Sequence, residues 1–186
     1  EALKRAEAES DPSRRDERLE IAASVALEQR DPERAVAIAR SISSEPRRSR
    51  TLESLLRSAT DSALRSGDVD AAIRYAKGIS NLDSRAFLLC KTADLLLKKK
   101  ETDRARALLG DTWAWIQPAQ TGPGKATTLL RVVGETVVID PQMAFGMMES
   151  TVDEINQAGF APAWVSSGRR IRQRPGDNLE RRSATV

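Results

Sequence analysis

The residues that come nearest to a chemical motif lie between positions 121 and 127. There the segment Gly124-Lys125-Ala126-Thr127 places a lysine and a hydroxyl after a glycine, as phosphate-binding loops do. Such a loop also needs a glycine five residues before the Gly-Lys pair, a hydroxyl directly after the lysine and a preceding β-strand. Those two positions hold Ala119 and Ala126, and the upstream segment has a helical pattern. We therefore interpret the stretch from Gln117 to Lys125 as a loop between helices.

Histidine is absent from the sequence, and this removes much of the chemistry that an enzyme could use. Histidine is the commonest general base, the commonest metal ligand and a member of every Ser-His-Asp triad. With one cysteine and no histidine, the chain also lacks the usual ligand set of a structural zinc site. Its carboxylates are interleaved with arginine and lysine, a pattern typical of solvated helix faces. The sequence predicts no enzymatic activity, no metal ion and no cofactor.

The single cysteine and a pair of tryptophans are two further candidates for functional residues. Cys90 lies in an apolar stripe, which favours a small core residue over a reactive thiol. Trp113 and Trp115 are two residues apart, so on a helix they point about 200° away from each other. We expect one of them to pack in the interior and the other to be partly exposed. The alternative is that the pair anchors a partner.

Arginine is concentrated near the C-terminal end. From Ala161 onward there are six arginines and two acidic residues, a sum of +4, so positions 1–160 sum to −1 within the total of +3. Arg169, Arg170, Arg172 and Arg174 could contact nucleic acid or another acidic surface. No aromatic residue stands between them, and the helical pattern has ended, so we expect a flexible basic tail.

The composition is that of a closely packed helical protein. Hydrophobic residues make up 40% of the 186 residues and aromatic residues only 4%, so small aliphatic side chains dominate the core. No apolar run approaches the ~20 residues that a membrane-spanning helix needs. The chain begins at Glu1 and not at methionine, which indicates a fragment or a processed product. One cysteine does not identify a compartment.

A recurring segment predicts the elements that position these residues. The stretch from Arg30 to Ile42 is matched by Gly67 to Ile79, with weaker copies at 101–109 and 140–148. The matching alanines recur at intervals of 37, 33 and 39 along the chain: Ala35, Ala72, Ala105 and Ala144. A period of this length is typical of stacked helical hairpins, because one hairpin cannot bury its apolar face without a neighbour.

Each unit is predicted to consist of two helices. The second helix begins at a capping residue, which is Asp31, Asp68, Thr102 or Asp140. In the first helix of three units, a small residue is matched to the alanine of the second helix; these residues are Ala23, Ala59 and Ala93. Small residues at matched heights let two helix backbones approach closely.

The first helix of the fourth unit has the weakest pattern. Its run from Val132 to Ile139 contains enough β-branched residues to suggest a strand. The run leads into Asp140-Pro141 at the expected place, and an array of hairpins offers no sheet partner. We therefore predict a helix there.

The segment Gly67-Asp68-x-Asp70-x-Ala72-Ile73-x-Tyr75-Ala76 resembles the second helix of a tetratricopeptide repeat. In that family a Gly-Asp turn leads into a helix that carries a small residue. The resemblance covers about residues 14–156. It implies an all-α, right-handed superhelix (a solenoid) of about four helix-turn-helix units, with a concave groove lined by the first helices.

The same resemblance implies which residues face the groove. The candidates for partner binding are Leu27, Glu53, Leu56, Thr60, Phe87, Asp94 and Leu97. The lysine and asparagine positions with which some family members clamp a peptide's terminal carboxylate are not matched. The resemblance therefore implies a groove for another kind of protein or peptide segment.

The predicted organisation has three parts: an N-terminal flank at 1–13, a helical repeat domain at 14–158 and a flexible basic tail at 159–186. The expected function is a non-catalytic scaffold that binds a protein or peptide in its groove. One alternative is a structural segment of a longer array without its own ligand. Another is association with nucleic acid or an acidic surface through the tail. The sequence leaves the oligomeric state open.

Overall fold

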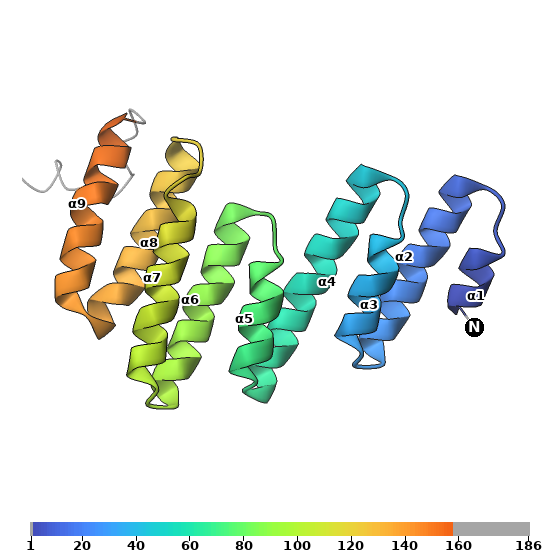
Figure 1. The fold of residues 1–186 in the computed structure, drawn as a ribbon, viewed down its shortest axis with the longest axis horizontal. Helices are drawn as coiled ribbons and strands as arrows, with labels where there is room; N and C mark the ends of the chain where they lie inside the picture. The colour runs from blue at the N-terminus through green and yellow to red at the C-terminus, as the bar shows by residue number, and fades with distance from the viewer. Residues whose placement is uncertain (1, 158–186) are drawn as a thin grey trace, which may run out of the picture.

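In a computed structural model of the protein, residues 2–157 are described, and they form nine α-helices and no β-strand. The helices follow one another along the longest axis of the molecule (Figure 1). Their bounds are α1 (Ala2–Glu7), α2 (Pro12–Glu28), α3 (Pro32–Arg40), α4 (Glu45–Ser66), α5 (Val69–Lys77), α6 (Leu82–Lys98), α7 (Thr102–Ile116), α8 (Pro123–Ile139) and α9 (Pro141–Gln157).

Each helix packs against the next one in the chain. The pairs α2–α3, α4–α5, α6–α7 and α8–α9 correspond to the four helical hairpins that the sequence predicts. The run from Val132 to Ile139 belongs to α8, so the prediction of a helix there is confirmed.

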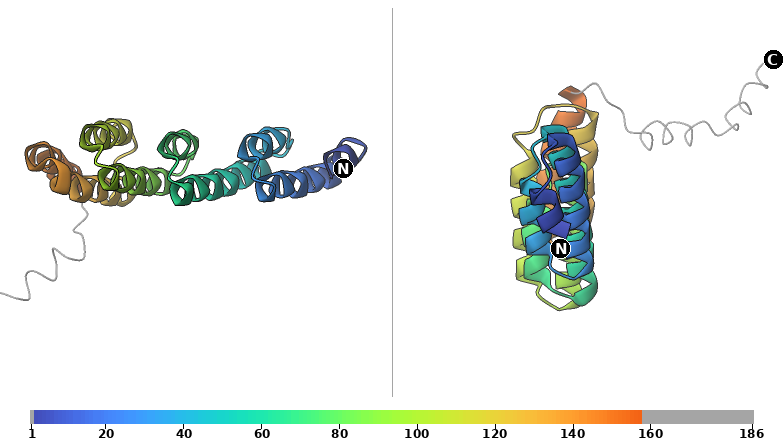
Figure 2. Two further views of the ribbon diagram at one scale, coloured as in Figure 1. Left: turned by 90° about the horizontal axis from the view of Figure 1, so that it is seen from below. Right: turned by 90° about the vertical axis from the view of Figure 1, so that its right-hand side faces the viewer.

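The first helices of the hairpins form a continuous layer. α2 contacts α4, α4 contacts α6 and α6 contacts α8, whereas α3, α5 and α7 show no comparable packing on one another. Figure 2 shows these second helices as a separate row above the first helices. We refer to α2, α4, α6 and α8 as the first-helix layer.

Capping side chains explain where the second helices begin. The carboxylates of Asp31, Asp68 and Asp140 each accept a hydrogen bond from the backbone N–H three residues later, at 3.0, 3.0 and 2.9 Å. The prediction is wrong in the third unit. There Glu101, and not Thr102, precedes the helix, and its side chain makes no capping bond.

The turns of the first three hairpins share a backbone conformation. Arg30, Gly67 and Lys100 have φ angles of 62°, 75° and 65°, in the left-handed region. Glycine adopts this region without a steric cost, whereas a side chain disfavours it. The three positions recur along the chain at the same intervals as the first three matching alanines. The turn is therefore part of the repeated unit.

The helical region begins earlier than the sequence predicts. α1 lies within the expected flank at 1–13, where its Ala6 is fully buried against α2. So short a helix is not stable alone, and packing on α2 must hold this one. The predicted loop from Gln117 to Lys125 is also shorter than expected, because α8 already begins at Pro123.

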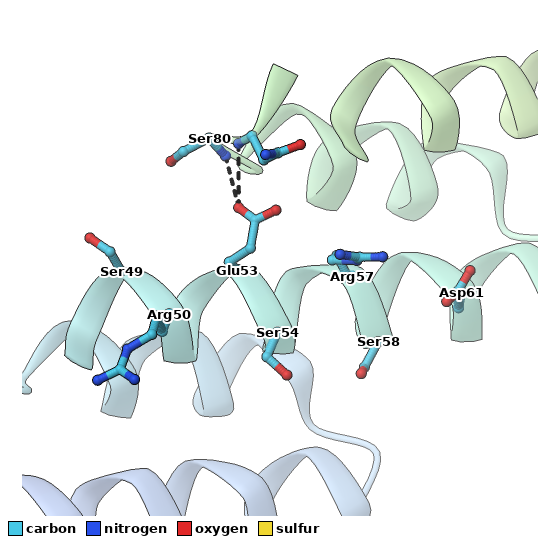
Figure 3. Close-up of a pocket in the computed structure, with 9 residues that line it drawn as sticks. Ser49, Arg50, Glu53, Ser54, Arg57, Ser58, Asp61 and Ser80 are labelled. Atoms are coloured by element: carbon cyan, nitrogen blue, oxygen red, sulfur yellow. Dashed lines mark hydrogen bonds between the residues drawn. The ribbon is translucent and has the colours of Figure 1, made fainter. Parts of the chain in front are cut away.

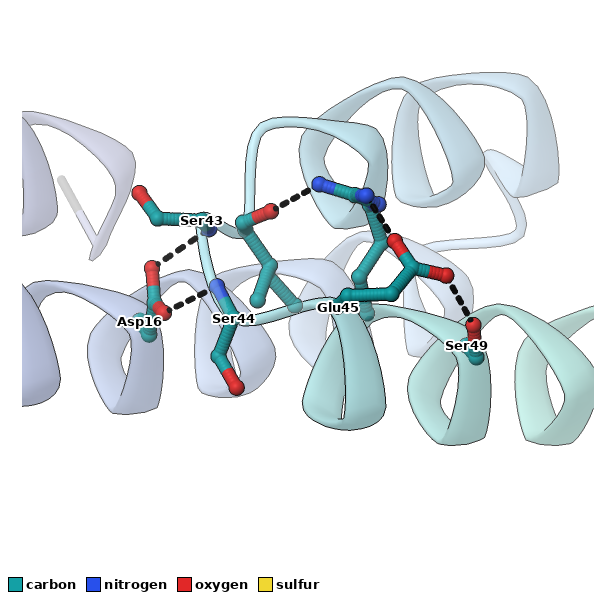
Figure 4. Close-up of polar contacts among 7 residues, drawn as sticks. Asp16, Ser43, Ser44, Glu45 and Ser49 are labelled. Carbon is teal, nitrogen blue, oxygen red and sulfur yellow. Dashed lines mark hydrogen bonds and ion pairs between the residues drawn. The ribbon is translucent and has the colours of Figure 1, made fainter.

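A carboxylate on one first helix holds the backbone that leads into the next first helix. Asp16 on α2 accepts hydrogen bonds from the N–H groups of Ser43 and Ser44, both at 2.8 Å (Figure 4). Glu53 on α4 accepts the corresponding bonds from residues 80 and 81, at 3.2 and 3.5 Å. Asp16 and Glu53 are separated by the same interval as Ala35 and Ala72, a recurrence that the sequence analysis missed. These contacts link each of the first two hairpins to its successor.

We expect Asp16→Asn to lower the free energy of unfolding by about 1–3 kcal/mol. One of the two backbone N–H groups would then face the NH2 group of the asparagine side chain, which is a donor and cannot accept its hydrogen bond. Burial alone would raise the pKa of Asp16, but the N–H groups of Ser43 and Ser44 outweigh it and lower that pKa. The stabilisation is therefore complete above the ordinary carboxyl pKa and is lost as the pH falls through the lowered one. Urea unfolding at pH 7 and in acid would measure both effects. The exposed neighbour provides the control, since Glu17→Gln should change little; equal losses for the two variants would contradict the contact.

Candidate interaction surface

The outer face of the first-helix layer consists of the solvent-facing residues of α2, α4, α6 and α8. Burial follows a similar order in α4 and α6, in which Leu55, Leu56 and Ala59 correspond to the buried residues 88, 89 and 92. The two helices differ at Arg57, which is exposed, whereas the corresponding Cys90 is buried. In the same alignment the outward-facing residues are Ser54, Ser58 and Asp61 on α4 and Phe87, Lys91 and Asp94 on α6.

Two of the seven predicted partner-binding residues lie in the core. Leu56 and Thr60 are only 9% and 0% exposed, and the Thr60 hydroxyl donates a hydrogen bond to the Leu56 carbonyl oxygen at 2.7 Å. The other five reach solvent: Phe87 and Asp94 are exposed, while Leu27, Glu53 and Leu97 are partly exposed. Glu53 is also held by the backbone before α6.

Leu56 and Thr60 were predicted to face the groove because the repeat units were aligned one residue out of register. The sequence analysis matched Ala59 to Ala23, whereas the contacts of Asp16 and Glu53 match Ala59 to Ala22. A shift of one residue turns a helical side chain by about 100°. The solvent-facing residue is therefore Arg57, the neighbour of Leu56.

A shallow groove of about 610 Å³ runs along this face of α4 (Figure 3). In the figure Glu53 points toward Ser80, while Ser54 and Ser58 point to the other side of the helix. The groove is lined by Ser49, Arg50, Glu53, Ser54, Arg57, Ser58, Asp61, Ser80 and Asn81. Its donors and acceptors suit a polar ligand such as an extended peptide.

Phe87 is the apolar centre of the neighbouring part of the face. Two cations lie over its ring: the Lys91 ammonium at 4.5 Å from the centroid and the Arg131 guanidinium at 5.2 Å. Arg131 on α8 also pairs with Asp83 on α6 at 3.1 Å, which joins the two helices. A half-exposed aromatic ring between charged groups is typical of a contact residue in protein interfaces.

A pair of carboxyl groups bridges the same two helices. The pKa of Glu135 on α8 is raised by burial and by the neighbouring carboxyl of Asp94 on α6, with Arg131 opposing the shift. A carboxyl pair of this kind can share a proton and accept hydrogen bonds from a ligand.

The two tryptophans are both half-buried but have different surroundings. Trp113 packs with Met143 and other apolar residues between the main core and α9. The Trp115 ring is covered by the Arg85 guanidinium, whose carbon lies 3.7 Å from the ring centroid. Burial lowers the pKa of Arg85. Contacts within the protein thus cover much of the surface of each tryptophan ring.

Cys90 and Lys125 are both buried. Burial raises the pKa of Cys90 to about 12, which keeps its thiol protonated at neutral pH. The Lys125 ammonium pairs with the Glu154 carboxylate at 2.8 Å, and both side chains are almost fully buried. The lysine of the Gly-Lys segment is therefore held by α9 and has no access to a phosphate. The predicted tail residues Arg169, Arg170, Arg172 and Arg174 lie outside the described residues.

Between residues 2 and 157, none of the helices combines the length and apolar character that crossing a membrane requires. In the same part of the chain, no three potential metal-ligating residues of the His, Cys, Asp and Glu types come together.

The structure defines the class of this chain as all-helical, with helices packed in sequence as hairpins. Comparison of the chain with protein-family models, with curated proteins and with solved structures found no match.

Proposed function

We propose that the protein is a non-catalytic, tetratricopeptide-like scaffold that binds a polypeptide partner on the outer face of its first-helix layer. The proposal includes a right-handed superhelix of four hairpins, as the resemblance implies. The single observation that supports it best is the groove along α4, whose side chains Ser54, Arg57 and Ser58 make no hydrogen bond or ion pair within the described part of the chain. Continuous contact from α2 to α8 adds a long surface to that groove.

The groove suggests what the partner carries. Arg57 makes no ion pair within residues 2–157, so its guanidinium can bind a carboxylate on the partner. Phe87, 37% exposed on the next first helix, favours an apolar side chain. The serine hydroxyls of α4 can bind the backbone of the same segment. We expect a peptide with an acidic and an apolar residue, laid across α4 and α6.

Selection of peptides from a display library against the full chain would test this function. Peptides that use the groove should lose about tenfold or more in affinity with Arg57→Glu and with Phe87→Ser, because both changes remove central contacts. The matched control is Arg40→Glu, an exposed arginine on α3 in the other row, which should bind as the parent does. Selected peptides that bind both groove variants with unchanged affinity would refute the proposal.

The tail offers a second route to a partner, through acidic surfaces. Binding by Arg169 to Arg174 would fall steeply with salt and would be insensitive to Arg57→Glu. That result would identify the tail, and not the groove, as the functional element.

A further inference from the structure

The last described helix has an uncovered apolar stripe. On α9, Phe145, Met148 and Val152 are 68%, 36% and 45% exposed. They are spaced i, i+3 and i+7, so they lie on one face of the helix. A different face of α9, with Ala144 and Met147, is buried against α8.

In the other second helices the position equivalent to Met148 is covered. When Ala144 is aligned with Ala35, Ala72 and Ala105, Met148 corresponds to Ala39, Ala76 and Leu109, each 0% exposed. In each of those units the second helix packs on the first helix that follows it, as α3 does on α4. By this correspondence, the α9 stripe lies where one further first helix would pack.

We propose that residues 162–174 of this chain dock on the α9 stripe as that further helix. Pro162 follows Ala144 at the same interval at which Pro123, the first residue of α8, follows Ala105. Proline is also the first residue of α2 and the second residue of α4. The segment from 158 to 161 is as long as the connection from 41 to 44 between α3 and α4. Proline at this point is suited to begin a helix.

The residue pattern of the segment fits the stripe. Trp164, Gly168 and Ile171 are spaced i, i+4 and i+7, which places them on one helical face. Packing that face on Phe145 and Met148 would remove apolar surface from water. A glycine in the middle of the face allows close approach of the two backbones.

The charges are also complementary. The acidic residues Glu149 and Asp153 are exposed on α9 beside the stripe. Residues 169–174 carry four arginines and no acid. A helix antiparallel to α9 places its early residues near Val152 and its later, arginine-rich residues near Met148 and Glu149, which favours this occupant over a neutral one.

Cysteine cross-linking in the full chain tests the docking. The two test pairs are Met148→Cys with Ile171→Cys, and Val152→Cys with Trp164→Cys, so that the result does not depend on one register. Met148 and Val152 are exposed, so replacing them leaves the buried core intact, and Cys90 is too buried to compete. The control pair is Ala107→Cys with Ile171→Cys, since Ala107 is exposed on α7. A disulfide needs the two Cα atoms within about 7 Å.

The proposal expects an intramolecular disulfide in at least one test pair, formed at least tenfold faster than in the control pair and at a rate independent of protein concentration. Equal rates in test and control pairs would mean that the segment has no preferred site and would overturn it. Disulfides that form only between molecules would assign the stripe to a second copy and would overturn it too. Failure of both test pairs to cross-link would likewise refute the docking.

Discussion

Replacing Leu56 by alanine is expected to lower the free energy of unfolding by about 2–5 kcal/mol, the usual cost of emptying a buried leucine site. The same replacement at Arg57 should change stability by no more than about 0.5 kcal/mol, because its side chain faces solvent without an intramolecular partner. Urea unfolding followed by far-UV circular dichroism would measure both values.

This comparison uses two adjacent residues and one substitution, so it reports the orientation of α4 directly. If α4 had the orientation that the alignment of Ala59 with Ala23 predicts, Leu56→Ala would have a small effect. Equal unfolding midpoints for Leu56→Ala and Arg57→Ala would therefore contradict the structure. A large loss for Leu56→Ala alone would also leave Arg57 as the right residue with which to test partner binding.

The second large effect is expected at the buried ion pair between α8 and α9. Removing one charge, by Lys125→Met or by Glu154→Gln, should destabilise the protein by about 3–5 kcal/mol, because the remaining charged or polar group stays buried without its partner. Replacing both residues, with Lys125→Met and Glu154→Leu together, should recover much of that loss. Thermal unfolding of the three variants at pH 7 would measure the differences.

The pair also predicts a pH dependence. The hydrogen bond from Lys125 lowers the pKa of Glu154, with burial acting in the opposite direction. A lowered folded-state pKa gives stability that is complete above the ordinary glutamate pKa and is lost as the pH falls through the lowered value. Lys125→Met should therefore weaken the acid sensitivity of the protein. The exposed pair of Arg106 and Asp103 is the control: Asp103→Asn should cost at most about 1 kcal/mol. Unchanged acid sensitivity in Lys125→Met would show that the pair does not control it.

Local patterns in the sequence were sufficient to predict the hairpins. Asp31 and Asp68 cap helices because their carboxylates reach N–H groups only three residues away. The alanines at 35, 72 and 105 mark the buried stripes for the same reason, since the helical period alone places them. Predictions of this kind depend on contacts between near neighbours in the chain.

The candidate surface was predicted less well, because its orientation depends on contacts between hairpins. Ala22 and Ala23 are both small, so the sequence offers no local reason to align one or the other with Ala59. The choice is made by Asp16 and Glu53, each of which binds the backbone at the start of the following hairpin. Of the predicted residues, Phe87 and Asp94 are exposed, as expected.

Sequence alone determined that the chain is helical and where most hairpins turn, because helix periodicity and capping act within a few residues. Tertiary structure decided which side of α4 meets solvent, that residues 2–7 form a helix, and that Lys125 is buried against Glu154. Each of these depends on groups from different helices, whose approach is set by the packing of whole helices. No local pattern encodes that packing, since a one-residue shift preserves the apolar stripe but turns the outward-facing side chains by about 100°.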